Sequence, residues 1–445
     1  MGAMRTSSWL PRLLALSVLA PACGADAPAP GSDPANPFTT PVTDDGKEDT
    51  AYQNPDGIEV EVDLEGDLVA PSYAKADGPA MLGQFALSYL RKHGQFYLES
   101  LAEDSTSDER VEWRVDGAWI TAAAARTADP AKLDHFRLRG VNAVLLLDAR
   151  DNAKVGKVFT AKVPLEPGAV MSKAKDTCAD HNDHITLGQG VYWYRWDADR
   201  ADCKLETQAL SVTISKVLPK GPTTYPEYDR LVADKKLTVV VLFGQIGDTL
   251  DDSDPGMRGA RQMQTWLEGA GFKKAQGPVG QRMTKLVGGT SVEIDLYSPK
   301  EFSGLSDFAH FGNFEKAIAE HEIVVYDGHS MLGASDYWAR PKYPDGYQIF
   351  LYGGCLGYEY YVRPILAGKK GWQNVDILSS VVEVSASAND FAAPLLAKMI
   401  WALDHGYRAS WNTLLVAVRK SVGDSTFGVS GVRDNCFSPT GTRCR

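Results

Sequence analysis

A histidine and a cysteine follow two successive apolar segments of the chain, and glycine stands next to each of them. Residues 323–327 lead into Gly-His-Ser, with the histidine at position 329, and residues 347–352 lead into Gly-Gly-Cys, with the cysteine at position 355. A thiolate is a strong nucleophile, and a neighbouring imidazole can take its proton and later protonate a leaving amine. The residue types at His329 and Cys355 therefore predict nucleophilic attack on a carbonyl group.

Short apolar segments that alternate with helical patterns surround this pair, which predicts a parallel sheet with helices on both faces. The predicted strands are residues 237–244, 291–297, 323–326, 347–352 and 375–384, and the predicted helices are residues 257–271, 308–321, 391–403 and 411–422. In such sheets function gathers at the carboxyl ends of the strands. If strands 323–326 and 347–352 are neighbours, His329 and Cys355 lie side by side at that edge.

The residues that flank the pair would complete the site. Glycine lets the backbone turn sharply and lets a substrate chain approach closely, which we expect at Gly328 and Gly354. The backbone N–H of Cys355 is placed to bind the oxyanion of a tetrahedral intermediate, and Ser330 offers a second backbone N–H.

This pattern of two strand ends resembles the caspase, gingipain, clostripain and legumain superfamily of cysteine peptidases, known as clan CD. The resemblance covers about residues 237–422, and the later strand at 375–384 with its following helix looks most like gingipain-type domains. It implies a caspase-haemoglobinase-like α/β fold in residues 236–424, with His329 as general base and acid and Cys355 as nucleophile. The implied activity is hydrolysis of peptide bonds in a peptide or protein substrate.

One position departs from the family pattern, in which glycine usually follows the histidine and helps to form the oxyanion hole. Here Ser330 follows His329 and Gly328 precedes it. The departure favours a second hypothesis, in which the chain is an inactive, binding-only protein of the cell envelope that keeps the fold.

An acidic loop follows the first predicted strand of the parallel sheet. It contains Asp248, Asp251, Asp252 and Asp254. Carboxylates here would pair with Lys or Arg of a substrate and so set specificity. A solvated acidic loop is the interpretation that we favour, and a weak calcium site is the other alternative.

The region before the parallel sheet has strand-like alternation at residues 58–62, 111–115, 190–196 and 210–214, and a helical pattern at residues 81–101. We expect a mostly-β accessory domain over residues 58–217, such as a sandwich. Its run Tyr192, Trp193, Tyr194 and Trp196 suits a β-domain core as well as a binding surface.

The first residues have the composition of an export signal. A segment with Arg5 and Arg12 precedes a short apolar run, and Cys23 follows small residues. This predicts a lipoprotein signal peptide over residues 1–23, with a lipid on Cys23, and ordinary secretion is the alternative. Residues 24–57, rich in Pro, Ala, Asp and Thr, predict a disordered tether. We expect an exported lipoprotein of the outer membrane that faces the periplasm or the cell surface.

Export favours disulfides, and the chain has six cysteines. Cys178 with Cys203, and Cys436 with Cys444 in the tail of residues 425–445, are the expected bridges. Cys355 then remains as a thiol, which indicates reactivity, although a buried inert cysteine is also common. Cys178 with His181 and His184 suggests a metal site only weakly, and a surface loop is the preferred interpretation.

The overall composition excludes other classes of partner. The net charge is −11, and no Lys/Arg block of the kind that follows a phosphate backbone is present, so we expect no nucleic acid partner. The sequence contains no cofactor motif that we recognise, and we expect neither a cofactor nor a bound metal.

Overall fold

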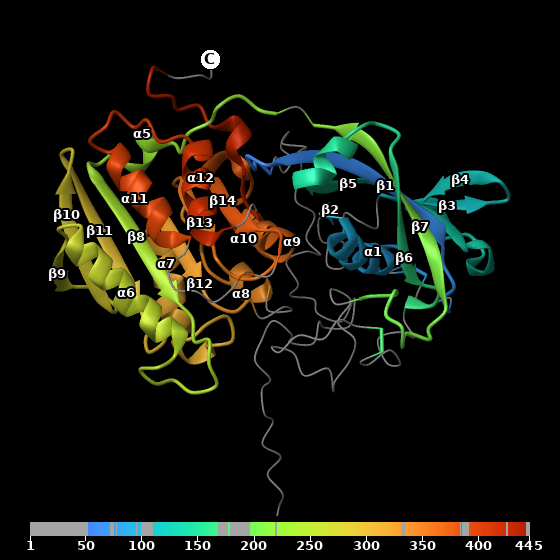
Figure 1. Ribbon diagram of the computed structural model, residues 1–445, viewed down its shortest axis with the longest axis horizontal. Helices are drawn as coiled ribbons and strands as arrows, with labels where there is room; N and C mark the ends of the chain where they lie inside the picture. Colours follow the sequence, from blue (N-terminus) through green and yellow to red (C-terminus); the bar gives the residue numbers. More distant parts are fainter. Residues whose placement is uncertain are drawn as a thin grey trace, which may run out of the picture.

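The computed structural model describes residues 52–71, 75–76, 78–94, 96–98, 110–167, 177–178, 196–218, 220–330, 335–382, 384, 391–423 and 426–441. These residues form a mixed α/β structure with two multi-stranded sheets (Figure 1). The predicted signal peptide with Cys23, the aromatic residues 192–195, and Cys444 all lie outside the described residues.

The first sheet is antiparallel and has seven strands in the order β4-β3-β5-β1-β7-β6, with β2 also paired to β5. Val60, Val62 and Leu64 alternate along β1 and are fully buried, and helix α1 covers this apolar face. The strands are β1 (Gly57–Asp67), β2 (Phe96–Leu98), β3 (Val111–Val115), β4 (Ala118–Thr121), β5 (His135–Leu146), β6 (Val158–Pro164) and β7 (Thr207–Val217). The helices here are α1 (Gly78–Gly94), α3 (Ala122–Ala125) and the 3-10 turns η3 (Pro130–Lys132) and η4 (Leu147–Asn152).

The second sheet has eight strands in the order β15-β14-β13-β12-β8-β11-β10-β9. The pairs from β14 to β11 are parallel, whereas β15, β10 and β9 add antiparallel edges. The strands are β8 (Lys236–Phe243), β9 (Lys273–Gln276), β10 (Gln281–Val287), β11 (Thr290–Tyr297), β12 (Ile323–Asp327), β13 (Gln348–Tyr352), β14 (Val375–Ser380) and β15 (Phe427–Ser430). Each predicted strand of the parallel sheet overlaps one of these strands.

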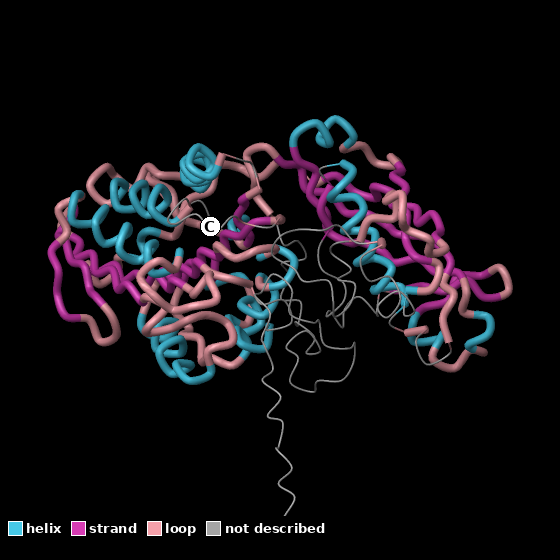
Figure 2. The backbone as a smooth tube through the Cα atoms, turned by 60° about the horizontal axis from the view of Figure 1, so that its bottom comes forward, coloured by secondary structure: helices cyan, strands magenta, loops and turns pink. Residues whose placement is uncertain are grey.

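Helices lie on both faces of the second sheet (Figure 2). Successive strand residues point to opposite faces, and the apolar side chains on each face pack against helices. Val239 and Val241 of β8 pack in the core beneath α6, α11 and α12, whereas Val240 and Leu242 pack in the core beneath α7, α8 and α10. The helices are α5 (Tyr228–Leu231), α6 (Pro255–Gly269), α7 (Phe311–Glu320), α8 (Ser335–Ala339), α9 (Gly357–Tyr360), α10 (Val362–Lys369), α11 (Ala392–Ala402) and α12 (Trp411–Val422). Three 3-10 turns complete the region, η7 (Phe308–His310), η8 (Trp372–Asn374) and η9 (Val432–Asp434).

The segment before β1 joins the two sheets. Gln53 pairs with Val429 of β15 through two backbone hydrogen bonds of 2.8 and 3.0 Å. The Tyr52 hydroxyl donates to the carbonyls of Ser379 and Thr426, at 3.0 and 2.7 Å. Residues 52–54 fall within the predicted tether, but they are an ordered part of the sheet edge because their backbone groups are paired.

Three other predictions need correction. The helix expected over residues 81–101 ends at Gly94, and β2 follows it. The described residues of the first region form one sheet covered by a helix, not the two packed sheets of a sandwich. The α/β unit does not end at residue 424, because β15 pairs with β14 and belongs to its sheet.

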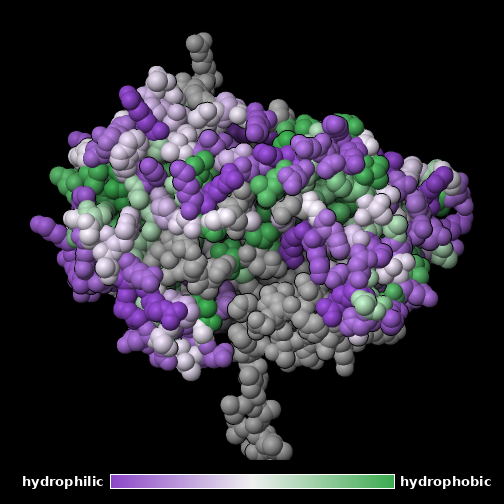
Figure 3. Space-filling view, in the orientation of Figure 1, coloured by the Kyte–Doolittle hydropathy of each residue, from purple (hydrophilic) through white to green (hydrophobic). Residues whose placement is uncertain are grey.

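The surface drawn in Figure 3 is mostly hydrophilic, with small apolar areas scattered over it. Among the described residues, the large apolar side chains that are exposed include Val155 in the turn before β6, Leu286 in β10 and Phe308 in η7. Scattered apolar residues of this kind are ordinary on a folded surface.

A buried charged cluster fastens the antiparallel edge to the parallel strands. Asp295 of β11, with a fully buried carboxylate, accepts two hydrogen bonds of 2.6 and 2.7 Å from Arg282 of β10. His321, just before β12, lies 3.2 Å from the same carboxylate. Burial alone would raise the pKa of Asp295, but the hydrogen bonds from Arg282 and His321 outweigh it and the pKa is lowered.

The charge of Asp295 should therefore stabilise the fold at neutral pH. We expect Asp295→Asn to lose about 3–5 kcal/mol of unfolding free energy, because it leaves the largely buried Arg282 guanidinium without the carboxylate that accepts two of its hydrogen bonds. Glu293→Gln is the control, since the side chain of this second partner of Arg282 is 19% exposed and its loss should cost less than that of the fully buried Asp295. Because the folded pKa is depressed, the contribution is lost as pH falls through it, so the unfolding free energies of the wild type and the variant in urea should converge as the pH is lowered below the usual carboxyl range. An equal gap at pH 7 and in acid would contradict this assignment.

Candidate functional site

The pairing of β12 with β13 sets the relative height of His329 and Cys355. These parallel strands are in register, with Tyr326 opposite Tyr352 at the last pair. His329 follows Tyr326 by the same number of residues as Cys355 follows Tyr352. Both residues therefore leave the same carboxyl edge of the sheet at the same level, as the sequence predicts.

Glycines allow the two strand ends to approach each other closely. A Cβ atom at Gly353 would lie 2.1 Å from the Phe391 ring, and one at Gly354 would lie 2.6 Å from the Ser330 hydroxyl. A Cβ at Gly328 would lie 3.0 Å from the Cα of Gly244 at the end of β8. Gly328 and Gly354 are buried, so their absent side chains make room for neighbouring chain segments.

Ser330 connects the two strand ends directly. Its hydroxyl donates to the carbonyl of Cys355 at 2.5 Å and accepts from the Tyr352 hydroxyl at 3.0 Å. The Tyr361 hydroxyl donates to the carbonyl of Ser330. Burial raises the pKa of Tyr352 well above its usual value, so its hydroxyl stays a donor. The serine that departs from the family pattern thus fixes the backbone of Cys355.

The imidazole of His329 points toward the end of β8. Its Nε2 lies 3.0 Å from the carbonyl of Ile246, which can only accept a hydrogen bond. Nε2 therefore carries a proton, and in the neutral ring Nδ1 is left as the acceptor. The Tyr326 hydroxyl holds the backbone carbonyl of His329 at 2.6 Å.

The thiol of Cys355 points in the other direction along the edge. It is a thiol rather than half of a disulfide, is only 6% exposed, and donates to the carbonyl of Val384 at 3.8 Å. Val384 follows β14, whereas Ile246 follows β8, and these strands lie on opposite sides of the β12–β13 pair. The backbones of His329 and Cys355 are thus adjacent, but these two side-chain contacts diverge. A rotation of the Cys355 side chain would be needed to bring its sulfur from Val384 toward the imidazole.

The turn after Cys355 has a strained residue. Leu356 has a φ of 54°, a left-handed conformation that is rare for a large side chain. It is held there by its burial and by a 2.9 Å hydrogen bond from its N–H to the carbonyl of Val382. Such strain is typical of functional sites, because the surrounding structure must hold it in place.

The acidic loop after β8 divides into two kinds of carboxylate. Asp254 is buried and accepts hydrogen bonds within the loop and at the start of α6. Asp251 accepts from Ser253, which lowers the pKa of its carboxyl group. Asp248 and Asp252 are exposed, and Asp252 lies 3.5 Å from Arg261. The buried Asp254 is therefore a structural residue, not a substrate ligand as the sequence allowed.

The cysteine predictions outside the site are partly tested. Cys178 and Cys203 form the expected disulfide, which removes Cys178 as a ligand for the weak metal site. His181 and His184 lie outside the described residues. Cys436 is disulfide-bonded as well.

Among the described residues, the one group of potential ligands close enough for a metal is His93, Asp197 and Asp199, which the sequence did not suggest. Lys92 and Lys162 already pair with these two carboxylates. The cluster is therefore explained as an ion-pair network.

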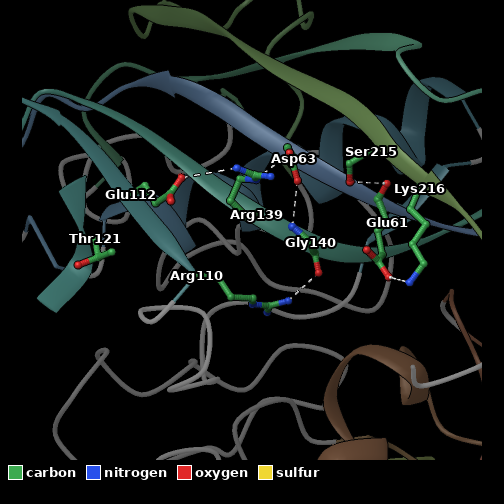
Figure 4. A pocket seen from close by; sticks show the side chains of 9 residues that line it. All are labelled: Glu61, Asp63, Arg110, Glu112, Thr121, Arg139, Gly140, Ser215 and Lys216. Carbon is green, nitrogen blue, oxygen red and sulfur yellow. Dashed lines mark hydrogen bonds and ion pairs between the residues drawn. The ribbon is translucent and has the colours of Figure 1, made fainter. Parts of the chain in front are cut away.

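A hollow of about 590 Å³ lies on the outer face of the first sheet (Figure 4). Its charged side chains pair with one another: Arg139 lies 2.9 Å from Asp63 and 3.7 Å from Glu112, and Lys216 lies 2.7 Å from Glu61. The hollow is open and its charges are already balanced, so its size alone does not make it the reactive site.

No protein-family model matches the sequence, and no curated protein matches it. Within the residues that the structure describes, none of the helices combines the length and the apolar character needed to cross a membrane. Sequence patterns found His329, Cys355 and Ser330, but gave no signal for Ile246, Tyr352 or Tyr361, whose contacts depend on the fold.

The Ser330 hydroxyl should stabilise this edge measurably. We expect Ser330→Ala to lose about 1–3 kcal/mol, because the Cys355 carbonyl and the Tyr352 hydroxyl would be left buried without that partner. Ser379→Ala is the matched control, because Ser379 is equally buried and its hydroxyl has no hydrogen-bond partner among the described residues. Thermal and urea unfolding of both variants would decide, and an equal loss in the two would show that the hydroxyl network contributes nothing specific.

Proposed function

We propose that the chain is a cysteine endopeptidase of the caspase/gingipain type, with Cys355 as nucleophile and His329 as general base and acid. The observation that carries the proposal is the register of β12 with β13, which brings both residues to one edge. The order of the parallel strands, β11-β8-β12-β13-β14, also supports it. His329 follows the third of these strands and Cys355 follows the fourth.

The proposed reaction begins when the thiol turns from Val384 toward the imidazole. Nδ1 of His329 takes the proton from Sγ, and the thiolate attacks the carbonyl carbon of the scissile bond. The backbone N–H groups of Cys355 and Ser330 stabilise the oxyanion. The imidazolium then gives its proton to the leaving amine, and water hydrolyses the thioester to release the acid and restore the thiol.

The hydrogen bond to Ile246 has a specific use in this scheme. It keeps the proton of the neutral ring on Nε2, so Nδ1 is the nitrogen that accepts the thiol proton. The exposed Asp248 and Asp252 lie in the same loop, where we propose that they attract Lys or Arg side chains of the substrate.

A second candidate is a binding protein that has the fold without the chemistry. The burial of Cys355 and the direction of its hydrogen bond favour it, because a thiol that never leaves Val384 cannot attack. The charged concave face of the first sheet would then supply the docking surface.

The proposed cellular location is inferred from the sequence of residues 1–51. We propose cleavage before Cys23, lipidation of that cysteine, and attachment to the outer membrane with the folded regions facing the periplasm or the cell surface.

Hydrolysis of a mixed fluorogenic peptide library by the purified protein tests the peptidase proposal. We expect turnover that falls at least about 10³-fold in Cys355→Ala and in His329→Ala, because each removes one half of the reacting pair. Cys203→Ser is not a useful control because it breaks a disulfide, so Ser379→Ala serves as the matched buried substitution and should retain activity. Equal turnover in the wild type and in Cys355→Ala would reject the peptidase and leave the binding protein.

The lipid anchor can be tested in the intact bacterium. Metabolic labelling with radioactive palmitate should mark the wild-type chain and place it in the membrane fraction. Cys23→Ser should lose the label and move to the soluble fraction, because no other residue is proposed to carry lipid. Retention of the label in Cys23→Ser would disprove this location for the anchor.

A further inference from the structure

Asp254 makes contacts that exceed those of an ordinary helix cap. Its Oδ1 accepts the backbone N–H of Met257 at 3.1 Å, which caps helix α6. Its Oδ2 accepts two more, from Ile246 at 3.0 Å and from Gly247 at 2.7 Å. A cap requires only the first contact, so the other two fix the loop after β8.

The loop that Asp254 fixes is the one that carries the partner of the histidine. The N–H of Ile246 is held by Asp254, and the carbonyl of Ile246 accepts the proton of His329 Nε2 at 3.0 Å. A continuous series of hydrogen bonds thus connects a carboxylate that is 3% exposed to the ring of the proposed general base.

Close packing keeps the two ends of this series in place. A Cβ atom at Gly256 in the first turn of α6 would lie 2.0 Å from the carbonyl oxygen of Gly244, so α6 begins in direct contact with the end of β8. The N–H of Gly244 in turn donates to the carbonyl of Asp327 at 2.8 Å, directly beside the histidine segment. The Ile246 carbonyl therefore has little freedom to turn away.

We propose that Asp254 is a positioning residue for the proposed peptidase: it holds the Ile246 carbonyl so that His329 keeps its proton on Nε2 and offers Nδ1 to the thiol. This inference rests on the proposed function for its use in catalysis. The state of the ring, however, can be measured whether or not the protein cleaves peptides.

The variant Asp254→Ser distinguishes the role of Asp254 as a helix cap from its role in holding the loop. Serine is as good a helix cap as aspartate, but its single short oxygen cannot also reach the N–H groups of Ile246 and Gly247. Ser410→Ala is the matched control, because it removes the cap of α12 at Thr413 and leaves the Asp254 loop unchanged. Gly247→Pro is a second test that removes one of the two loop N–H donors and keeps the cap, should the serine variant fail to fold.

The measurement is nitrogen NMR of the full chain labelled with ¹⁵N-histidine, with His329→Gln used to assign the signals. We expect the neutral ring of the wild type and of Ser410→Ala to be protonated on Nε2 alone, and Asp254→Ser to show a mixture of the two ring forms. If peptides are cleaved, kcat should fall about 10-fold in Asp254→Ser with KM nearly unchanged. An unchanged ring in Asp254→Ser, or the same change in Ser410→Ala, would overturn the inference. The predicted ring change in a chain without peptidase activity would instead disprove the proposed function and leave the positioning role standing.

Discussion

The parallel pairing of β12 with β13 is the interaction on which the rest of the site depends. It brings His329 and Cys355 to one edge at one level, and its close approach is possible only because the positions after each strand are glycines. A Cβ atom at Gly354 would lie 2.6 Å from the Ser330 hydroxyl, and one at Gly353 would lie 2.9 Å from the Tyr326 carbonyl oxygen, so either would press on the neighbouring segment. The positions of His329 and Cys355 therefore depend first on the glycines that let the two backbone segments pack closely together.

Close approach buries backbone carbonyls, and buried carbonyls need donors. Hydroxyl groups supply them: Tyr326 for His329, Tyr361 for Ser330, and Ser330 for Cys355. These bonds fix the main chain at the edge while the imidazole and the thiol turn outward toward β8 and β14. In this resting state the backbone is fixed and the two side chains point apart. The proposed chemistry would then need a rotation of the Cys355 side chain and no movement of the strands.

The sequence predicted the parallel strands well, because their continuous apolar runs are the signature of strands buried on both faces. It also identified His329 and Cys355, because the glycines that follow each apolar segment can be recognised in the sequence itself. It missed β9, β10 and β15, which are short, partly exposed or close to the chain end and have weak patterns. It also missed the roles of Ile246 and Asp254, because a backbone carbonyl has no sequence signature and a buried aspartate resembles its exposed neighbours. The ordered edge at residues 52–54 was hidden for a similar reason, as its stability comes from pairing with β15, far away in the chain.

The imidazole and the thiol at this edge are proposed to act on each other, and the rate of Cys355 alkylation as a function of pH measures that coupling. A thiolate stabilised by a neighbouring imidazolium reacts well below the ordinary thiol pKa of about 8.5. Because the thiol must first turn from Val384 toward the imidazole, we expect a rotated fraction of wild-type Cys355 to react with iodoacetamide near pH 6–7, and we expect this low-pH reaction to disappear in His329→Ala. Superimposable pH–rate curves for the two proteins would contradict it, because they would show that His329 has no influence on the sulfur.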